Sequence, residues 1–163
     1  MAMTKKSAPK WLNPREMKAW RSYIIASRRL LEALELDLGD HDLSMADYEV
    51  MAQLSDAPGR RMRMSELAEV AMLSKSRLSH RMKVMEKAGW IRRQECEVDR
   101  RGSWAVMTDK GWRAIVAAAP DHVSSVRKRF LDQLSVKEQE ALTSTFAHLT
   151  EELRVQFKEE RLD

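Results

Sequence analysis

The chain has 163 residues, of which 44% are hydrophobic and 33% charged, so it is long enough for one domain or two tightly fused halves. With five glycines and four prolines it is too poor in turn residues for a β-sandwich, and its composition favours long helices. The longest apolar run, Ala114 to Ala119, is too short for a membrane span. A single cysteine excludes an intramolecular disulfide, and the first residues lack the apolar stretch of a signal peptide. We therefore expect a cytoplasmic protein without membrane contact.

The net charge of +4 is distributed unevenly along the chain. Residues 58–113 hold 14 basic and 7 acidic residues, a net charge of +7, whereas the remaining residues hold 15 basic and 18 acidic, a net charge of −3. A cationic segment between acidic flanks is typical of a protein that binds nucleic acid or another anionic surface. The alternative is a solvated basic face with no partner.

Two helices are predicted before the basic segment. Asn13 followed by Pro14 is a helix start, because an asparagine side chain can cap a helix and proline is favoured at its first position. The positions that follow recur at steps of three and four residues, which predicts one long amphipathic helix: Met17, Trp20, Ile24, Ser27, Leu31, Leu34 and Leu38. Ser44 with Asp47 resembles a capping box for a shorter second helix, which residues 57–59 end.

Within the basic segment the pattern predicts a strand followed by two short helices. Residues 61–64 alternate charged and apolar side chains, which suits a strand with its two methionines facing inward. Helices over about 65–71 and over 75–88, joined by a short turn, predict a helix-turn-helix. Ser74 is the expected cap of the second helix, and Gly89 closes it in the left-handed conformation that glycine favours.

A hairpin and two more helices complete the chain. Strands are predicted over residues 90–95 and 103–108, with a charged tip between them. Thr108 is the expected cap of a helix that begins near Asp109 and that Pro120 interrupts or kinks. Ser135 with Glu138 predicts another capping box. The last helix then has the apolar positions Leu142, Phe146, Leu149, Leu153 and Phe157.

The helix over residues 75–88 is the candidate recognition element for duplex DNA. A helix of this length fits the major groove, and Leu78, Met82 and Met85 form its buried side. The predicted DNA contacts of this element are Ser74, Lys75, Ser76, Arg77, Ser79, His80, Arg81 and Lys83. Among them we expect Ser76, Arg77 and His80 to reach bases, and Lys75, Arg81 and Lys83 to reach phosphates. The hairpin tip adds Asp99, Arg100 and Arg101 as predicted minor-groove contacts. The alternatives are a solvated helix face and an ordinary polar turn.

Two motifs carry a resemblance to a known family. The first is Leu73-Ser74-Lys75-Ser76-Arg77-Leu78-Ser79-His80 followed by Met85-Glu86-Lys87-Ala88-Gly89. The second is Asp99-Arg100-Arg101 followed by Met107-Thr108-Asp109-Lys110-Gly111, in which Met107 stands where leucine is more usual. These segments resemble the recognition helix and the wing of the MarR (multiple antibiotic resistance regulator) family of bacterial transcription regulators.

The resemblance implies a mainly α (α+β) fold, a winged helix-turn-helix with long N- and C-terminal dimerisation helices. It also implies a homodimeric transcriptional regulator, a repressor on a palindromic operator that a small-molecule effector releases. We therefore assign residues 1–12 to a mobile segment, 13–43 and 109–163 to the dimerisation region, and 44–108 to the DNA-binding domain. The uncovered apolar positions at both ends of the chain independently favour a dimer, with an intrachain helical pair as the alternative.

No other chemistry is predicted. The sequence has no phosphate-binding glycine loop, nucleophile elbow or zinc-ligand spacing, so we expect no enzyme, cofactor or metal site. Cys96 is expected to be a free thiol without a role, and His41 and His122 lie roughly where some relatives bind zinc. The effector-binding residues stay unassigned, because Trp20, Tyr23 and Ile24 are more typical of a core. The functional alternative is a winged-helix module that binds a protein, or that binds DNA without sequence preference.

Overall fold

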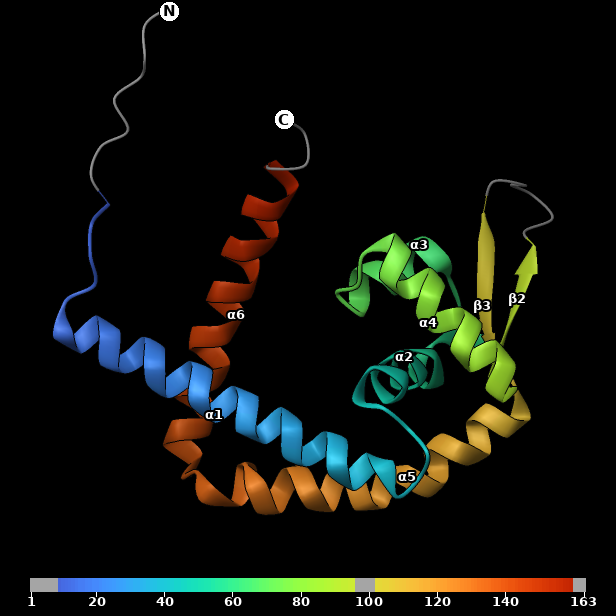
Figure 1. The fold of residues 1–163 in the computed structure, drawn as a ribbon, viewed down its shortest axis with the longest axis horizontal. Coiled ribbons are helices and arrows are strands. Elements are labelled where there is room, and N and C mark those ends of the chain that lie inside the picture. The colour runs from blue at the N-terminus through green and yellow to red at the C-terminus, as the bar shows by residue number, and fades with distance from the viewer. Residues whose placement is uncertain (1–8, 96–101, 160–163) are drawn as a thin grey trace, which may run out of the picture.

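The computed structural model describes residues 9–95 and 102–159 of the chain. Figure 1 shows two parts: an arm formed by α1, α5 and α6, and a lobe formed by the remaining elements. The elements are α1 (Pro14–Gly39), α2 (Met45–Asp56), β1 (Arg61–Arg63), α3 (Met64–Val70), α4 (Lys75–Ala88), β2 (Ile91–Glu95), β3 (Ser103–Met107), α5 (Asp109–Arg129) and α6 (Val136–Glu159). In these described residues, no helix has the combination of length and apolar character that crossing a membrane requires.

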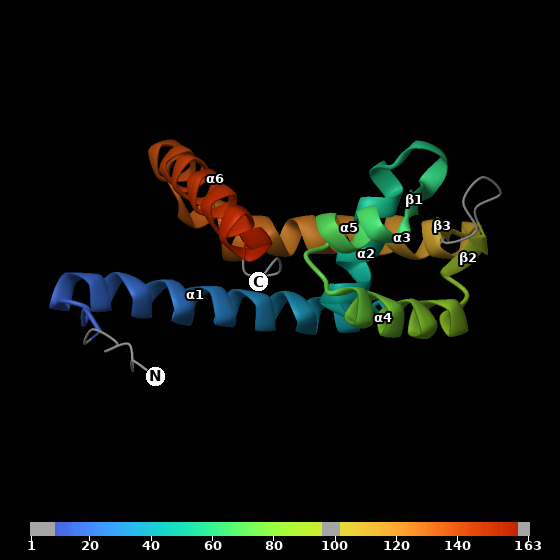
Figure 2. The same cartoon turned by 90° about the horizontal axis from the view of Figure 1, so that it is seen from above.

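Helix α1 begins at the predicted cap and is buried only near its end. The Asn13 side chain accepts the Glu16 N–H at 3.0 Å, and the Glu16 carboxylate accepts the Asn13 N–H at 2.9 Å, which forms a capping box. The helix contacts α5, and both views show it running along the arm (Figures 1 and 2). Leu34 and Leu38 are its only fully buried residues. The first half of α1 therefore leaves its apolar stripe uncovered in the single chain.

The core lies in the lobe and is aliphatic and thioether in character, as the composition predicts. Its largest side chains with almost no exposure come from α1 to α4 and β2: Leu38, Val50, Met51, Leu54, Leu67, Leu78, Met82, Met85 and Ile91. Helix α2 lies at the centre of this packing, since it contacts α1, α3, α4, α5 and the sheet. Truncating one such side chain to alanine typically costs about 2–5 kcal/mol.

The three strands form one antiparallel sheet in the order β1-β3-β2. Ile91 of β2 pairs with Met107 of β3, and Met62 of β1 pairs with Ala105, so these side chains share the face that packs on the helices. The residues between them point to the opposite face, where Arg61 and Arg92 are exposed and Val106 between them is buried. The winged helix-turn-helix fold predicted from the sequence is thus confirmed.

Of the two outcomes predicted at Pro120, an interruption or a kink, the structure excludes the interruption. Helix α5 is continuous from Asp109 to Arg129 with Pro120 inside it. The helix does change direction part-way along its length (Figure 1). A proline removes one N–H from the helical ladder and crowds the preceding turn, which typically kinks a helix without having to end it.

The predicted strands are each one residue too long, for reasons that lie in the flanking helices. Met64 begins α3 instead of ending β1, because the extended Arg63 is already its N-cap. Trp90 follows the C-cap of α4 and takes part in the capping of that helix, because its N–H donates to the Met85 carbonyl at 3.0 Å. Thr108 is the N-cap of α5, as predicted, and its side chain accepts the Gly111 N–H at 3.0 Å.

Candidate nucleic-acid interface

Helix α4 has the boundaries and the buried side that the sequence predicts. The Ser74 hydroxyl accepts the Arg77 N–H at 3.3 Å, and Gly89 ends the helix in the left-handed conformation with φ 78°. Leu78, Met82 and Met85 are fully buried against the lobe. This packing fixes which side of α4 remains available to a partner.

The other side of α4 carries most of the predicted DNA contacts and is open to solvent. The exposed members are Ser74, Lys75, Ser76, Arg77, His80 and Lys83. Within the part of the chain that the structure describes, no ion pair involves Lys75, Arg77 or Lys83. A hollow of about 350 Å³ lies beside this side, between α4 and the start of α2. The result is a concave cationic surface on which Lys75, Arg77 and Lys83 have no ion-pair partner within the described residues.

Arg93, which was not among the predicted contacts, joins the hairpin to Ser79 of α4. Arg93 of β2 donates from Nη2 to the Ser79 carbonyl at 3.0 Å, and its backbone N–H donates to the Glu86 carboxylate at 3.0 Å. Its Nε also lies 3.6 Å from Glu86. Arg93 therefore fixes the hairpin on α4, and the alternation along β2, which turns Arg93 toward the helices, was the signal available for it.

Arg81 faces the protein rather than solvent. Its Nη1 lies 3.3 Å from the Ser44 hydroxyl and 3.4 Å from Oδ1 of Asp47, whose side chain is only 7% exposed. Asp47 is also part of the capping box of α2 with Ser44. The predicted phosphate contact of Arg81 stays a prediction, but this geometry gives Arg81 a second role, since it joins α4 to the start of α2.

We expect Arg81→Met to lower the free energy of unfolding by about 1–2 kcal/mol, because the buried Asp47 carboxylate loses its cation. The cost is moderate because the Arg81 side chain is itself partly exposed to solvent. Urea unfolding measures the change. Lys83→Met is the matched control, since Lys83 lies exposed on the same helix and makes no ion pair in the described residues. Equal stabilities for the two variants would show that the Arg81–Asp47 contact stabilises nothing.

Three elements meet at the base of the hairpin around Thr108. The Thr108 hydroxyl lies 2.7 Å from the Gly89 carbonyl and 3.1 Å from the Trp90 carbonyl, while the Thr108 N–H donates to the Trp90 carbonyl at 2.9 Å. Lys110 Nζ donates to the Ala88 carbonyl at 2.7 Å, which satisfies one of the last carbonyls of α4. The end of α4, the hairpin and the start of α5 are thereby fixed together, which accounts for Thr108 and Gly111 in the sequence motif.

A polar cluster joins the end of α1 to α5. Asp37 of α1 accepts hydrogen bonds from Ser125 and from Arg129 of α5, the latter at 2.9 Å from Nη2. The Arg129 guanidinium, followed by the Ser125 hydroxyl, holds the pKa of Asp37 below its ordinary value. His41 Nε2 lies 2.9 Å from Asp121, across the connection between α1 and α2. These contacts hold α5 to the end of α1.

His122 lies at the same junction. Its ring centroid is 4.2 Å from that of Tyr48 in α2, and its Nδ1 is buried without a hydrogen-bond partner in the described residues. Burial lowers the pKa of His122, an effect that the charge of Asp37 opposes. The described residues contain no group of three or more potential ligands that could hold a metal ion.

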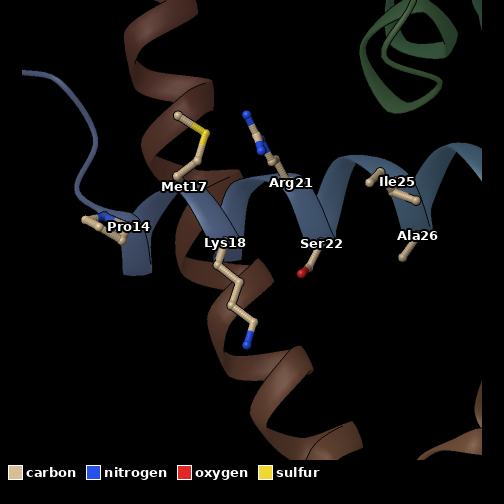
Figure 3. Close-up of a pocket in the computed structure, with 7 residues that line it drawn as sticks. All are labelled: Pro14, Met17, Lys18, Arg21, Ser22, Ile25 and Ala26. Atoms are coloured by element: carbon tan, nitrogen blue, oxygen red, sulfur yellow. The ribbon is translucent and has the colours of Figure 1, made fainter.

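Several large apolar side chains of the arm remain exposed. On α1 they include Trp20 and Tyr23, and on α6 Phe146, Leu149 and Leu153. Tyr23 and Phe146 touch across the two helices, with ring centroids 5.7 Å apart. A hollow of about 610 Å³ lies along α1, and its lining residues, which Figure 3 draws, all belong to α1. One helix cannot enclose a small molecule, so this hollow is part of the uncovered surface of the arm.

Comparisons with known proteins agree with this geometry. The sequence model of the MarR family matches residues 41–102. The chain is 34% identical over 99 residues to the transcriptional regulator HosA of Escherichia coli O127:H6. This match covers 61% of this chain and 71% of HosA. AbsC is a MarR family transcriptional regulator from Streptomyces coelicolor whose crystal structure matches this chain with a TM-score of 0.87. The two sequences are 44% identical, and the match covers 90% of this chain and 99% of AbsC.

The chain belongs to the MarR family. A second relative is Sco3205, a MarR family transcriptional regulator from Streptomyces coelicolor whose crystal structure is a complex with DNA. It is 38% identical with a TM-score of 0.87, and the match covers 89% of this chain and 92% of that one. The protein is therefore a MarR-family transcriptional regulator with a winged-helix fold, and MarR regulators as a class are not enzymes.

The wing of this MarR-family protein bears the remaining predicted contacts. Asp99, Arg100 and Arg101, together with Cys96, lie outside the described residues, so their predicted roles stay predictions. The strands that carry the wing, β2 and β3, are described and are fixed to α4 by Arg93 and to α5 by Thr108. The hairpin and the recognition helix thus form one rigid unit at their base.

Proposed function

We propose that this MarR-family regulator is a homodimer that binds a palindromic double-stranded operator, represses transcription from it and is released by a small-molecule effector. The observation that carries the proposal is the exposed side of α4, where Lys75, Arg77 and Lys83 have no ion-pair partner in the described residues. Arginine and lysine in this position can bond phosphates or guanine edges. Binding needs no cofactor, and we expect no catalytic activity and a cytoplasmic location.

The homodimer is supported by the apolar surface of the arm. Trp20 is 54% exposed and Leu149 is 44% exposed in the single chain. Exposed apolar surface of this kind is typical of an interface, and two-fold pairing is the commonest way to cover it. We assign residues 13–43 and 109–163 to this dimerisation region, and residues 44–108 to the DNA-binding domain. A two-fold axis through the arm would then give two recognition helices, each for one half-site.

Effector release is supported by the way in which lobe and arm are connected. The connection from α1 to α2 and helix α5 join them, and the lobe meets the arm where α2 packs on the end of α1 and on α5, with Leu38, Ile115 and Ala118 in the shared core. A ligand that binds one orientation of the lobe more tightly than another would change the separation of the two recognition helices. A loss of the spacing that the operator requires would release the DNA.

The direct test is selection of duplexes from a random pool by the full chain, followed by sequencing. The proposal predicts an enriched palindrome whose half-sites lie about one helical turn apart, 10–10.5 bp centre to centre. No enriched sequence would instead favour the alternative, a winged-helix module that binds DNA without sequence preference or binds a protein. The selected duplex is then used to screen small molecules for release.

Arg77→Ala is expected to relax sequence preference at one position of each half-site. A bidentate contact from arginine to a guanine edge contributes about 1–3 kcal/mol of discrimination, which is roughly a 5-fold to 150-fold difference between the correct and the wrong base. Fluorescence anisotropy with the selected operator and with single-base variants measures it. Lys87→Ala is the control, because Lys87 is exposed on the last turn of the same helix and is not a predicted contact. Unchanged discrimination by Arg77→Ala would remove Arg77 from the base-reading set.

A further inference from the structure

The outer face of the three-stranded sheet carries a cationic cluster that the proposed recognition surface does not use. The register of the sheet places Arg61, Val106 and Arg92 in one row across the strands, and Arg63, Trp104 and Gln94 in the next. Residues that pair directly across antiparallel strands share a face, so all six side chains lie on the side away from α4. Arg61 and Arg63 therefore flank Trp104, while Arg92 lies in the row of Val106 and donates from Nη1 to the Gln94 side chain at 3.0 Å.

Arg61 and Arg63 contact an aromatic ring rather than a carboxylate. The guanidinium carbon of Arg61 lies 5.0 Å from the centroid of the Trp104 ring, and that of Arg63 lies 4.9 Å from it. Within the residues that the structure describes, neither arginine forms an ion pair or a side-chain hydrogen bond. A guanidinium placed over a ring keeps its in-plane N–H donors free for a phosphate, and the ring limits its motion.

The position of this face indicates which anion it meets. Figures 1 and 2 place the sheet at the end of the molecule farthest from α6 and from the start of α1. In a dimer joined through the arm, the two sheets are therefore the outermost parts. Helix α4 contacts β2 on the inner side of the sheet, so the outer face looks along the duplex beyond the half-site that α4 occupies.

We infer that Arg61, Arg63 and Arg92 bind phosphates of the duplex that flanks each half-site, so that the footprint extends past the recognition helix and the wing. This inference rests on the proposed function. The contact reads no bases, because it goes to the backbone, and it adds affinity that depends on duplex length and on salt. It accounts for a guanidinium cluster in which Arg61 and Arg63 have no carboxylate partner within the residues that the structure describes.

The test compares two duplexes: the selected operator alone, and the same operator extended by about 10 bp of unrelated sequence at each end, which is roughly one helical turn. Wild-type protein should bind the extended duplex at least roughly 10-fold more tightly at low salt, with a steeper salt dependence. Each phosphate contact adds about 0.9 to the slope of log K against log salt. The double variant Arg61→Gln/Arg63→Gln should lose this gain and about 2 units of slope per protomer.

The variant should keep the wild-type affinity for the short operator, which shows that it is folded and that α4 still functions. Lys87→Gln/Lys137→Gln removes the same charge from exposed positions outside the sheet and should keep the gain from extension. An extension that adds no affinity to wild-type protein overturns the inference while leaving the proposed function intact. A double variant that retains the gain overturns it as well. Failure of the wild-type protein to prefer the operator over unrelated duplex is a failure of the proposed function itself.

Discussion

Replacing Leu149 by glutamate should convert the proposed dimer to a monomer and lower the affinity for a palindromic operator by at least roughly 100-fold, because two linked half-site contacts become independent. Leu149 is 44% exposed in the single chain, so the substitution costs little within one protomer. In the proposed dimer the same position is covered, and an unpaired carboxylate there costs several kcal/mol. Analytical ultracentrifugation and fluorescence anisotropy measure the two effects.

Ser144→Glu is the matched control for Leu149→Glu. It adds the same charge to α6, on the side opposite the apolar positions Phe146, Leu149 and Leu153, where the Ser144 hydroxyl bonds only the Ala141 carbonyl of its own helix. This variant should remain a dimer with wild-type affinity. If Leu149→Glu also remained a dimer, α6 would not be part of the interface, and the assignment of the arm as the dimerisation region would be wrong.

Gly111→Ala should destabilise the fold by about 3 kcal/mol, the upper end of the usual cost of overpacking. A Cβ at Gly111 would collide with the Trp90 carbonyl oxygen, and would also approach the Met107 side chain at 3.1 Å. The Trp90 carbonyl cannot move freely, because it accepts the Thr108 N–H at 2.9 Å and lies 3.1 Å from the Thr108 hydroxyl. For a chain of this size the expected fall in Tm is roughly 6–12 °C in a thermal melt.

Gly39→Ala serves as the comparison for Gly111→Ala. A Cβ at Gly39 meets nothing within 4 Å, and Gly39 is the last helical residue of α1 without a positive φ. Alanine there should leave stability unchanged or raise it by about 0.4–1 kcal/mol through the unfolded chain. Equal melting temperatures for the two variants would mean that the backbone at the base of the hairpin shifts to accommodate the added Cβ in spite of its hydrogen bonds.

Much of the lobe could be predicted from the sequence because its signals are local. Ser74 and Gly89 mark the two ends of α4 by their capping preferences, and the spacing of Leu78, Met82 and Met85 identifies its buried side. The caps Asn13, Ser44 and Thr108 fixed the starts of three other helices in the same way. These features depend on residues within one turn of each other, so no knowledge of the tertiary fold was needed.

The features that could not be predicted depend on contacts between distant segments. Arg81 looks like its exposed neighbours on α4, and only the position of Asp47 turns it toward the protein. Arg93 and Ser79 meet because the hairpin folds back on α4, and the ring of Trp104 lies beside Arg61 and Arg63 because of the register between β1 and β3. At Pro120 the local sequence allows either an interruption or a kink, and the continuous helix α5 is held near its two ends by Ala88 and Asp37.

The central claim is that the exposed side of α4 reads the sequence of a duplex. Its most direct measurement is the ratio of two dissociation constants at one fixed, near-physiological salt concentration, for the selected palindrome and for a scrambled duplex of the same length and composition. Specific DNA-binding proteins bind their sites typically 10³-fold or more tightly than unrelated DNA, and we expect a ratio of at least about that size. A ratio near one would contradict the claim and would identify the protein as a binder of DNA charge alone.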